Sequence, residues 1–394
     1  MHISEAAINN DLIETLRGTI LFPMDTHAYS TWLEIDLGAI QHNLKTIKAI
    51  TKTQVMAIIK ANGYGHGVLA VAKAVTEAGA EWCGVARMEE AINLRQAGIA
   101  GQIMVLGYSP PRLIPAAIEH DIHVAIYNPH MAHDYVTYAA AYHGRLKMHV
   151  KVETGMGRLG MAVEQVPKFL GEFHRHPNLE IDGIFTHFAK ADEKNSDTTQ
   201  RQLSVFNDLL TQLKKAKLCP ELVHAANSAA IFNYPESYFG MVRPGIALFG
   251  LDPSPNSPLP LSFRPALAWK ARLTSVRKFP PGHGISYGSV YITSGCERIG
   301  VVPVGYGDGY RREPDQRVLV RGQLVDIVGR VCMDQSMLQL DSVPEACAGD
   351  EVVLLGEQGG QRITASDIAN CWGTINYEVV CGLADRLPRV YLGK

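Results

Sequence analysis

Short apolar runs alternate with longer segments of helical periodicity from residue 53 to about residue 250. Parallel strands that are buried on both faces have such near-continuous apolar runs, and the helices that connect them need segments of this length. Eight runs are expected to form strands, at residues 54–59, 82–86, 103–106, 123–126, 147–152, 181–188, 222–226 and 244–249. Helices are expected between them, including residues 88–97, 112–120, 166–174 and 199–217. This order predicts an α/β fold of the (β/α)8 TIM-type barrel; a doubly wound open sheet is the alternative.

The pattern changes after residue 250, where residues 251–265 are rich in proline and serine and indicate a linker. Beyond it, apolar and polar residues alternate as they do in strands with one buried face. Strands are expected at residues 266–275, 299–304, 317–320, 325–328, 337–340 and 351–355, and one helix near residues 365–371. We therefore expect a barrel at residues 31–262 and a mainly antiparallel β-domain at residues 263–394. Residues 1–30 form an extension that could contain an amphipathic helix and to which we assign no function.

Composition narrows the functional classes. The chain has 394 residues with 37 basic and 39 acidic side chains, and this balance argues against nucleic acid as a partner. We find no apolar run of membrane-spanning length and no basic leader of the secretory type, so the cytoplasm is the expected compartment. The seven cysteines are scattered and form neither a disulfide framework nor a paired zinc motif, so we expect no metal.

Lys60 ends an apolar run and is followed at once by the glycine-rich segment Ala61-Asn62-Gly63-Tyr64-Gly65-His66-Gly67. A lysine at the carboxyl end of a buried strand is partly desolvated, and desolvation favours the neutral, nucleophilic amine. The glycines would let the backbone approach a phosphate group. A lone lysine after a strand more often reaches out to solvent, so the neighbouring residues carry the interpretation.

Polar side chains follow most of the expected barrel strands. Because the active sites of such barrels lie on the loops at the carboxyl ends of the strands, these residues are expected to meet on one face. Each alone has an ordinary structural explanation, such as a buried histidine or a solvated arginine. The residues concerned are Lys60, Arg87, Lys151, Arg158, His187, Asn227, Ser228 and Arg243.

Several blocks of the chain resemble the bacterial alanine racemases, over about residues 31–394. They include the segment from Lys60 to Gly67 and the strings KVETGMGRLG, GIFTHFA, MVRPGIALFG and RVCMDQ. The block Ile285-Ser286-Tyr287-Gly288 and the segment from Thr374 to Glu378 extend the likeness through the second domain. Blocks of this length in the same order are more specific than a glycine-rich loop or a shared barrel fold.

The resemblance implies a homodimer that uses pyridoxal 5'-phosphate. Lys60 would hold the cofactor covalently and carry a proton on one face of the substrate carbon. Tyr287, contributed by the partner subunit, would act on the opposite face. Racemisation needs two such groups, because the proton leaves one face and returns on the other. Both groups have pKa values near ~10 in solution, which must be lowered for proton transfer at neutral pH.

The resemblance also assigns the residues that bind the cofactor. Arg243 would donate to the pyridine nitrogen, and a guanidinium that keeps its proton would leave this nitrogen unprotonated and weaken the electron sink. His187 and Asn227 would line the ring. The phosphate would be held by hydroxyl and backbone N–H groups of Tyr64, Ser228, Gly245, Ile246 and Tyr377.

Three residues would bind the substrate or orient its binding group. Lys151 matches a family position whose amine takes up carbon dioxide and becomes an anion, N6-carboxylysine, which orients Arg158; an unmodified lysine is the alternative. Arg158 would then bind the carboxylate of the amino acid, with the backbone N–H of Met333. The chain departs from the family pattern at Glu153, where aspartate is expected, and at Lys190, where a small residue is usual.

The sequence therefore predicts an alanine racemase that supplies D-alanine for peptidoglycan precursors. The shared blocks do not define side-chain selectivity, so a racemase for serine, lysine or a broad set of amino acids remains an alternative. A decarboxylase of related architecture would not need the opposed Lys60 and Tyr287. A non-catalytic carrier of pyridoxal phosphate is the alternative from another class, and it would not need the second domain.

Overall fold

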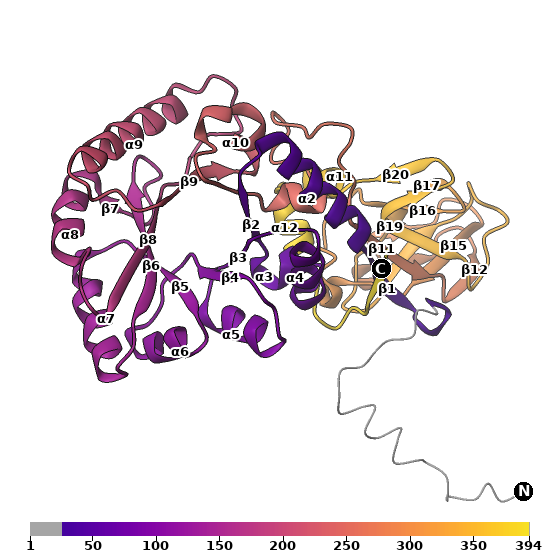
Figure 1. Ribbon diagram of the computed structural model, residues 1–394. Helices are drawn as coiled ribbons and strands as arrows, with labels where there is room; N and C mark the ends of the chain where they lie inside the picture. Colours follow the sequence, from indigo (N-terminus) through magenta and orange to yellow (C-terminus); the bar gives the residue numbers. More distant parts are fainter. Residues whose placement is uncertain (1–25, 394) are drawn as a thin grey trace, which may run out of the picture.

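The protein is described by a computed structural model that covers residues 26–393 (Figure 1). A ring of strands and helices forms one body, and a β-rich domain packs beside it. The amphipathic helix that the sequence suggests within residues 1–30 lies outside the described residues. Within them, the chain begins with a single turn of 3-10 helix, η1 (Thr26–Ala28).

The first body is a closed barrel of parallel strands, which rules out the open-sheet alternative. Strand β10 pairs with β2 at one point of the ring, and β5 pairs with β6 at another, so the strand order returns to its start. In the described part of the chain the ring consists of β2 (Gln54–Ile58), β3 (Trp82–Val85), β4 (Gln102–Val105), β5 (Ile122–Ile126), β6 (Leu146–Glu153), β8 (Leu179–Phe185), β9 (Leu222–Asn227) and β10 (Met241–Arg243). The short β7 (Met161–Ala162) pairs with β6 outside the ring.

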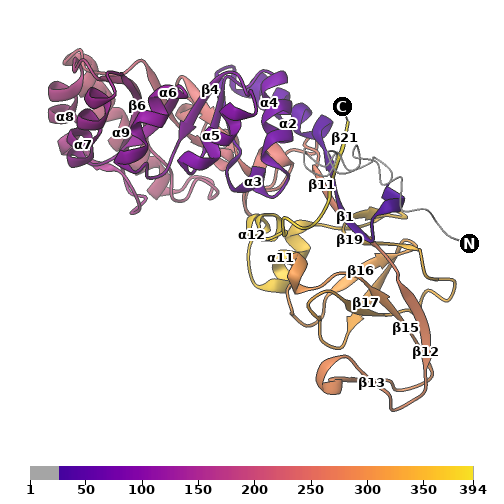
Figure 2. The same cartoon turned by 90° about the horizontal axis from the view of Figure 1, so that it is seen from below.

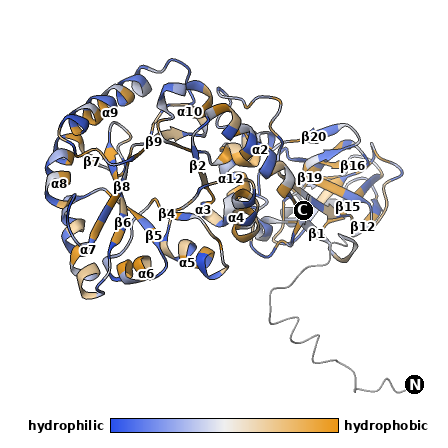
Figure 3. Cartoon of the chain, in the orientation of Figure 1, coloured by the Kyte–Doolittle hydropathy of each residue, from blue (hydrophilic) through white to orange (hydrophobic). Residues whose placement is uncertain are grey.

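Helices surround the barrel and cover its strands (Figure 1). Apolar and polar residues alternate along helices such as α9, as expected when one face packs on the strands and the other meets water (Figure 3). The expected helices at 88–97, 112–120, 166–174 and 199–217 are confirmed within a few residues. The helices of this body are α2 (Leu37–Thr51), α4 (Val68–Glu77), α5 (Met88–Gln96), α6 (Ile114–Glu119), α7 (Pro129–Ala141), α8 (Val166–Phe173), α9 (Asp197–Lys215) and α10 (Ser228–Asn233).

The expected eighth strand at residues 244–249 is wrong. The strand is the preceding segment β10, and Ile246–Phe249 forms a 3-10 helix, η5. Pro244 has no N–H to donate to a strand ladder, so it ends the pairing. The residues that follow are buried on every side, and an apolar run of this kind does not distinguish a strand from a short helix.

The second body is a mainly antiparallel sheet. Its strands follow the order β12-β15-β18-β17-β16-β19-β11-β1-β21, and β20 pairs with β19. The strands are β1 (Thr31–Asp36), β11 (Leu267–Arg272), β12 (Ser275–Phe279), β15 (Glu297–Val302), β16 (Arg317–Val320), β17 (Gln323–Val328), β18 (Ser336–Gln339), β19 (Glu351–Gln358), β20 (Gln361–Ile363) and β21 (Arg389–Leu392). A separate ribbon joins β13 (Gly284–Ile285) to β14 (Tyr291–Ile292). Figure 2 shows β13 at the end of the domain that is remote from the barrel.

The chain enters the β-domain before it builds the barrel. Strand β1 pairs with β11 and β21, although the sequence pattern grouped residues from 31 onward with the barrel. Trp32, Leu33 and Ile35 of β1 are fully buried in this sheet. Two short helices, α11 (Ala365–Trp372) and α12 (Asn376–Cys381), lie between the sheet and the barrel (Figure 2). They bring residues of the second body to the carboxyl ends of the barrel strands.

Candidate active site

A cavity of about 740 Å³ lies at the carboxyl ends of the barrel strands. It collects residues that are far apart in sequence and that the sequence analysis singled out separately. Those that line it are Lys60, Tyr64, Lys151, Arg158, His187, Asn227, Ser228, Arg243, Gly245, Ile246 and Tyr377. This grouping is the one that the barrel architecture predicts. Tyr377 comes from α12, so the second body closes one side of the cavity.

Lys60 begins a left-handed turn, α3 (Lys60–Tyr64), that follows β2 directly. Ala61, Asn62 and Gly63 all have φ between 53° and 63°, and Glu90 stabilises the turn by accepting a hydrogen bond from the backbone N–H of Ala61 at 2.7 Å. Such left-handed residues cost energy and persist only where their surroundings fix them. Burial, and then the positive charge of Arg158, lowers the pKa of Lys60. The neutral amine is thereby favoured, as a nucleophile or a base requires.

Arg243 lies at the end of β10, beneath the cavity, with 4% of its surface exposed. Its guanidinium donates to the carbonyl oxygen of Thr186 at 2.7 Å, to that of Ala225 at 2.9 Å and to Nδ1 of His224 at 2.9 Å. Burial lowers the pKa of Arg243 to about 9, so the group is still a cation at neutral pH. A guanidinium can only donate hydrogen bonds, and the two carbonyl oxygens and the ring nitrogen that accept from it hold it in place. Nδ1 of His187 lies 3.3 Å from the same guanidinium.

Hydroxyl and backbone N–H groups gather around the start of η5. The hydroxyl of Ser228 accepts hydrogen bonds from the N–H groups of Gly245 at 2.9 Å and of Ala247 at 3.3 Å. The rings of Tyr64 and Tyr377 lie 6.2 Å apart, and burial raises the pKa of both, so both keep their protons as donors. A Cβ on Gly245 would lie 2.5 Å from the Tyr64 hydroxyl, so the close approach needs glycine here. Such a set of neutral donors suits a phosphate group.

Lys151 is 6% exposed and lies at the end of β6, on the wall of the same cavity. Burial, helped by the charges of Arg158 and Arg243, lowers the pKa of Lys151 to about 8. Its Nζ lies 5.6 Å from the centre of the Phe185 ring. The neutral amine, which is the form that can react with an electrophile, is therefore more populated near physiological pH than in an ordinary lysine.

Glu153 organises the loop that carries Arg158. Its carboxylate accepts hydrogen bonds from the backbone N–H groups of four consecutive residues, at 2.5 Å from Gly155, 2.6 Å from Met156, 3.0 Å from Gly157 and 3.3 Å from Arg158. Burial alone would raise the pKa of this carboxyl, but the four bonds lower it. The glutamate that departs from the family pattern thus works as a loop cap.

Replacing Glu153 with glutamine should loosen this loop, because a neutral amide offers one acceptor oxygen in place of two charged ones. We expect KM for the amino-acid substrate to rise by about tenfold, with a small change in kcat, since a charge-assisted bond contributes roughly 1.5–3 kcal/mol. Steady-state kinetics would measure this. Glu164→Gln is the matched control on the exposed surface beyond the loop, and an unchanged KM in Glu153→Gln would contradict the role.

Three of the expected residues, Arg87, Tyr287 and Met333, do not line the cavity of their own chain. Arg87 is exposed at the start of α5. Tyr287 and Met333 lie in the β-domain and are 69% and 54% exposed. Tyr287 adjoins β13, at the end of the domain that is remote from the barrel (Figure 2). Val290 and Ile292, close to Tyr287 in sequence, are also exposed, whereas the exposed Ile375 lines the cavity itself. Exposed apolar side chains in such number are typical of surfaces that contact another protein.

Lys190, the second departure from the family pattern, is paired. Its amine lies 3.2 Å from the carboxylate of Glu193, next to Asp192, which lines the cavity. Sequence reasoning missed Glu90 and His224, which contact Lys60's turn and Arg243 respectively. Neither has a distinctive motif. A glutamate in the first turn of a helix that follows a strand is a weak signal that could have pointed to Glu90.

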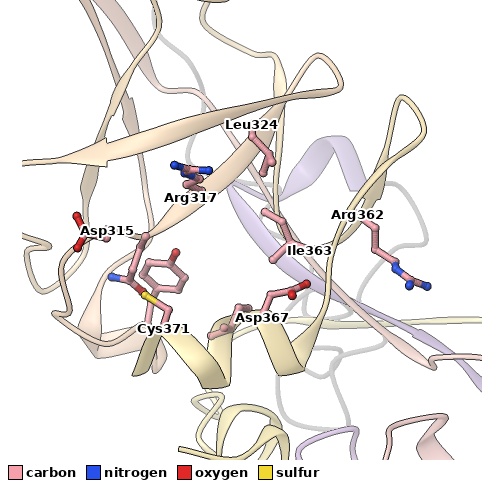
Figure 4. Close-up of a pocket in the computed structure, with 10 residues that line it drawn as sticks. Asp315, Arg317, Leu324, Arg362, Ile363, Asp367 and Cys371 are labelled. Carbon is pink, nitrogen blue, oxygen red and sulfur yellow. The ribbon is translucent and has the colours of Figure 1, made fainter. Parts of the chain in front are cut away.

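A second hollow lies on the β-domain, away from these residues, and has a volume of about 360 Å³. Figure 4 shows Leu324 and Ile363 near its centre and Arg362 pointing away. Two of its charged groups are already engaged: Arg317 pairs with Asp326 at 2.9 Å, and Asp367 accepts from the Thr364 hydroxyl at 2.6 Å. We assign the chemistry to the barrel cavity.

Fold and cavity together define a class of enzyme in which a lysine amine at the mouth of a parallel barrel works beside a separate β-rich domain. No helix in the described residues has the length and apolar character needed to cross a bilayer. Two sequence families match the chain: "Alanine racemase, N-terminal domain" at residues 35–253 and "Alanine racemase, C-terminal domain" at residues 266–391. The chain belongs to the alanine racemase family.

Individual relatives agree with this assignment. The chain is 42% identical over 367 residues to the alanine racemase of Symbiobacterium thermophilum, a match that covers 92% of this chain and 97% of the relative. Among solved structures, the alanine racemase of a D-cycloserine-producing Streptomyces lavendulae superposes with a TM-score of 0.88 at 38% identity, over 93% of this chain and 97% of that one. The Bacillus anthracis alanine racemase with bound L-Ala-P gives 0.87 at 38% identity, over 93% and 96%.

Proposed function

We propose that this protein interconverts L-alanine and D-alanine with pyridoxal 5'-phosphate as its cofactor. The observation that carries the proposal is the single cavity that contains the Lys60 amine, the Arg243 guanidinium and the hydroxyls around η5. Similarity to relatives named alanine racemase supports the choice of substrate. The product D-alanine would serve peptidoglycan precursors in the cytoplasm.

The residues present fit this cofactor. Donors without charge surround the start of η5, where a phosphate would need them, and Gly245 leaves room beside Tyr64 that a Cβ would fill. Arg243 would face the pyridine nitrogen, with His187 and Asn227 beside the ring. When bound, pyridoxal phosphate supplies a carbonyl that joins amines and an electron sink that acidifies the α-proton of an amino acid.

The chain's own groups would then move the proton. Lys60 anchors the cofactor and takes or returns the α-proton on one face of the substrate carbon. Tyr287 of the partner subunit does the same on the other face, so each active site needs both copies of a homodimer. The exposure of Tyr287 and its distance from the barrel of its own chain support this arrangement. We likewise propose a division at about residue 262 between the barrel and the β-domain.

Arg158 would bind the carboxylate of the amino acid, together with the backbone N–H of Met333 from the partner subunit. A planar guanidinium can hold a carboxylate with two parallel hydrogen bonds and so orients it. Lys151, as N6-carboxylysine, would hold Arg158 in place. Carboxylation would also replace the positive charge of the buried Lys151 amine with a negative charge, and this charge would attract Arg158 and Arg243.

Carboxylation of Lys151 can be detected directly. Because its pKa is lowered to about 8, we expect a carbamate carbon signal in NMR spectra of the protein equilibrated with ¹³C-labelled bicarbonate at neutral or mildly alkaline pH. The signal should fade as pH falls and the amine becomes protonated. Lys151→Met should abolish it. Lys147→Met, on the same strand but paired with Asp121 at 2.7 Å, is the control that should retain it; persistence in Lys151→Met would refute the assignment.

The function is tested by incubating cofactor-loaded protein with L-alanine, L-serine and L-lysine separately and quantifying both enantiomers by chiral chromatography. Preferential racemisation of alanine is the expected result. Faster conversion of serine or lysine would keep the chemistry and change the substrate. Release of carbon dioxide, or cofactor binding without any conversion, would replace the proposal with a decarboxylase or a carrier.

A further inference from the structure

A run of buried polar rings extends from Arg243 into the barrel, away from the cavity. Arg243 Nη1 lies 2.9 Å from His224 Nδ1, and His224 Nε2 lies 2.9 Å from His149 Nδ1. Both histidines are fully buried, and the ring of His224 stacks on Phe185 with centroids 4.7 Å apart. Burial, followed by neighbouring positive or potentially positive groups, lowers the pKa of both histidines well below the usual value, so both are neutral.

Hydrogen-bond chemistry fixes where each proton lies. A guanidinium only donates, so His224 Nδ1 must accept, and the single proton of this neutral ring is on Nε2. That N–H donates to His149 Nδ1, which must therefore be unprotonated. The proton of His149 is then on its Nε2. The hydrogen bonds of the run therefore all have one direction, from Arg243 to His224 and from His224 to His149. The cation Arg243 is the first donor and fixes this direction.

The far end of the run lies beside His123 and Asp182. Ring nitrogens of His149 and His123 and a carboxylate oxygen of Asp182 all lie within 4.8 Å of one another. His123 Nδ1 lies 3.2 Å from Asp182, and His123 Nε2 lies 2.9 Å from the side-chain oxygen of Gln102. His149 Nε2 has no hydrogen-bond partner among the described residues.

Two histidines and a carboxylate are also a common set of metal ligands. A metal on His149 Nε2, however, requires a lone pair there and moves the proton to Nδ1. That N–H would donate to His224 Nε2 and force the His224 proton onto Nδ1, where it would meet an N–H of Arg243 at 2.9 Å. Two donors cannot face each other at this distance without losing the contact, so the run and a metal at His149 exclude each other.

We propose that His224 and His149 are positioning residues: a tautomer-locked pair that holds Arg243 as a fixed cationic donor toward the position that the pyridine nitrogen would take. The inference rests on the proposed function in so far as Arg243 faces the cofactor. Without the pair, the cation would be left with the two carbonyl oxygens and His187 as its partners. An unanchored guanidinium could turn, and the hydrogen bond to the pyridine nitrogen would weaken.

The protonation pattern is tested first without cofactor. In ¹⁵N-histidine NMR spectra of the cofactor-free chain, His224 and His149 should each show a protonated Nε2 and an unprotonated Nδ1, with assignments from His224→Gln and His149→Asn. Addition of Zn²⁺ should leave both rings unchanged. A proton on His149 Nδ1, or a Zn²⁺-dependent shift of His149 and His123 together, would overturn the proposal. This readout does not depend on racemase activity.

Two substitutions at His149 separate positioning from packing. His149→Asn keeps an acceptor where Nδ1 was, because both atoms are bonded to Cγ, whereas His149→Leu fills the space without an acceptor. We expect His149→Leu to weaken pyridoxal phosphate binding by about tenfold and to shift the absorption spectrum of the bound cofactor, since His224 is left with an unsatisfied buried N–H. His149→Asn should restore most of both properties.

The matched control is His123→Leu, which removes a buried ring next to the run but outside it. It should lower the thermal unfolding midpoint without changing the His224 tautomer or the cofactor spectrum. Equal cofactor affinity in wild type and His149→Leu, or equal impairment of the leucine and asparagine variants, would overturn the positioning role. Failure of the wild-type chain to bind pyridoxal phosphate at all would instead contradict the proposed function, while the NMR result would still decide the tautomers.

Discussion

Lys60→Ala is expected to lower kcat/KM for alanine racemisation by at least about 10³-fold, because under the proposed function one change removes both the covalent anchor of the cofactor and the proton carrier on one face. Initial rates in both directions, measured by chiral chromatography on cofactor-loaded protein, would show it. Lys190→Ala is a suitable control, since this lysine is close to the cavity but already paired with Glu193. Its activity should stay within about threefold of wild type.

The loss in Lys60→Ala should not come from unfolding. Burial lowers the pKa of Lys60, so the folded state binds this proton less tightly than the unfolded chain does. At every pH below the unfolded pKa the lysine therefore destabilises the folded state of the cofactor-free chain, and its removal should leave the thermal unfolding midpoint of that form unchanged or higher. Substantial racemisation by a folded Lys60→Ala protein, with no amine added, would contradict the mechanism.

The barrel could be predicted because its strands are buried on both faces. Such strands are nearly continuous apolar runs, and seven of the expected runs coincide with strands within a few residues. The same property produced the error at residues 244–249, where burial on all sides hides the difference between a strand and the 3-10 helix η5. Strand β1 was misplaced for another reason: its partners β11 and β21 lie more than 200 residues away, and no local pattern encodes such a pairing.

The residues of the site were predictable to different degrees. Lys60 and Arg158 lie in motifs with unusual glycine content, and the structure brings them into one cavity. The function of Glu153 as a loop cap depends on four backbone N–H groups that converge only in the folded loop. His224 and His149 are single histidines within apolar strands, and nothing in the sequence distinguishes them from ordinary core residues. The role that we propose for them rests on the hydrogen bonds that connect them to Arg243.

Tyr287→Phe is expected to separate the two faces of the reaction. Without the phenolic hydroxyl, racemisation should fall by about 10²–10⁴-fold, the usual contribution of one acid/base group. Exchange of the α-proton with deuterated solvent should survive for the enantiomer that Lys60 deprotonates and be lost for the other. Tyr291→Phe, in the neighbouring strand β14, is the control, because the hydroxyl of Tyr291 donates to Glu297 at 2.6 Å and is therefore engaged within its own domain. Equal wild-type exchange from both enantiomers in Tyr287→Phe would remove this residue from the mechanism.

Mixing the two inactive variants tests whether the active site is shared between subunits. In a heterodimer of Lys60→Ala and Tyr287→Phe chains, one site receives both defects, and the other combines an intact Lys60 with an intact Tyr287 of the partner subunit. If chains mix at random on co-expression, half of the dimers have one intact site, so about one quarter of wild-type activity should return. If Tyr287 served the barrel of its own chain, every site would contain one defect and no activity would return. Recovery therefore depends on the geometry that leaves Tyr287 exposed and remote from its own barrel.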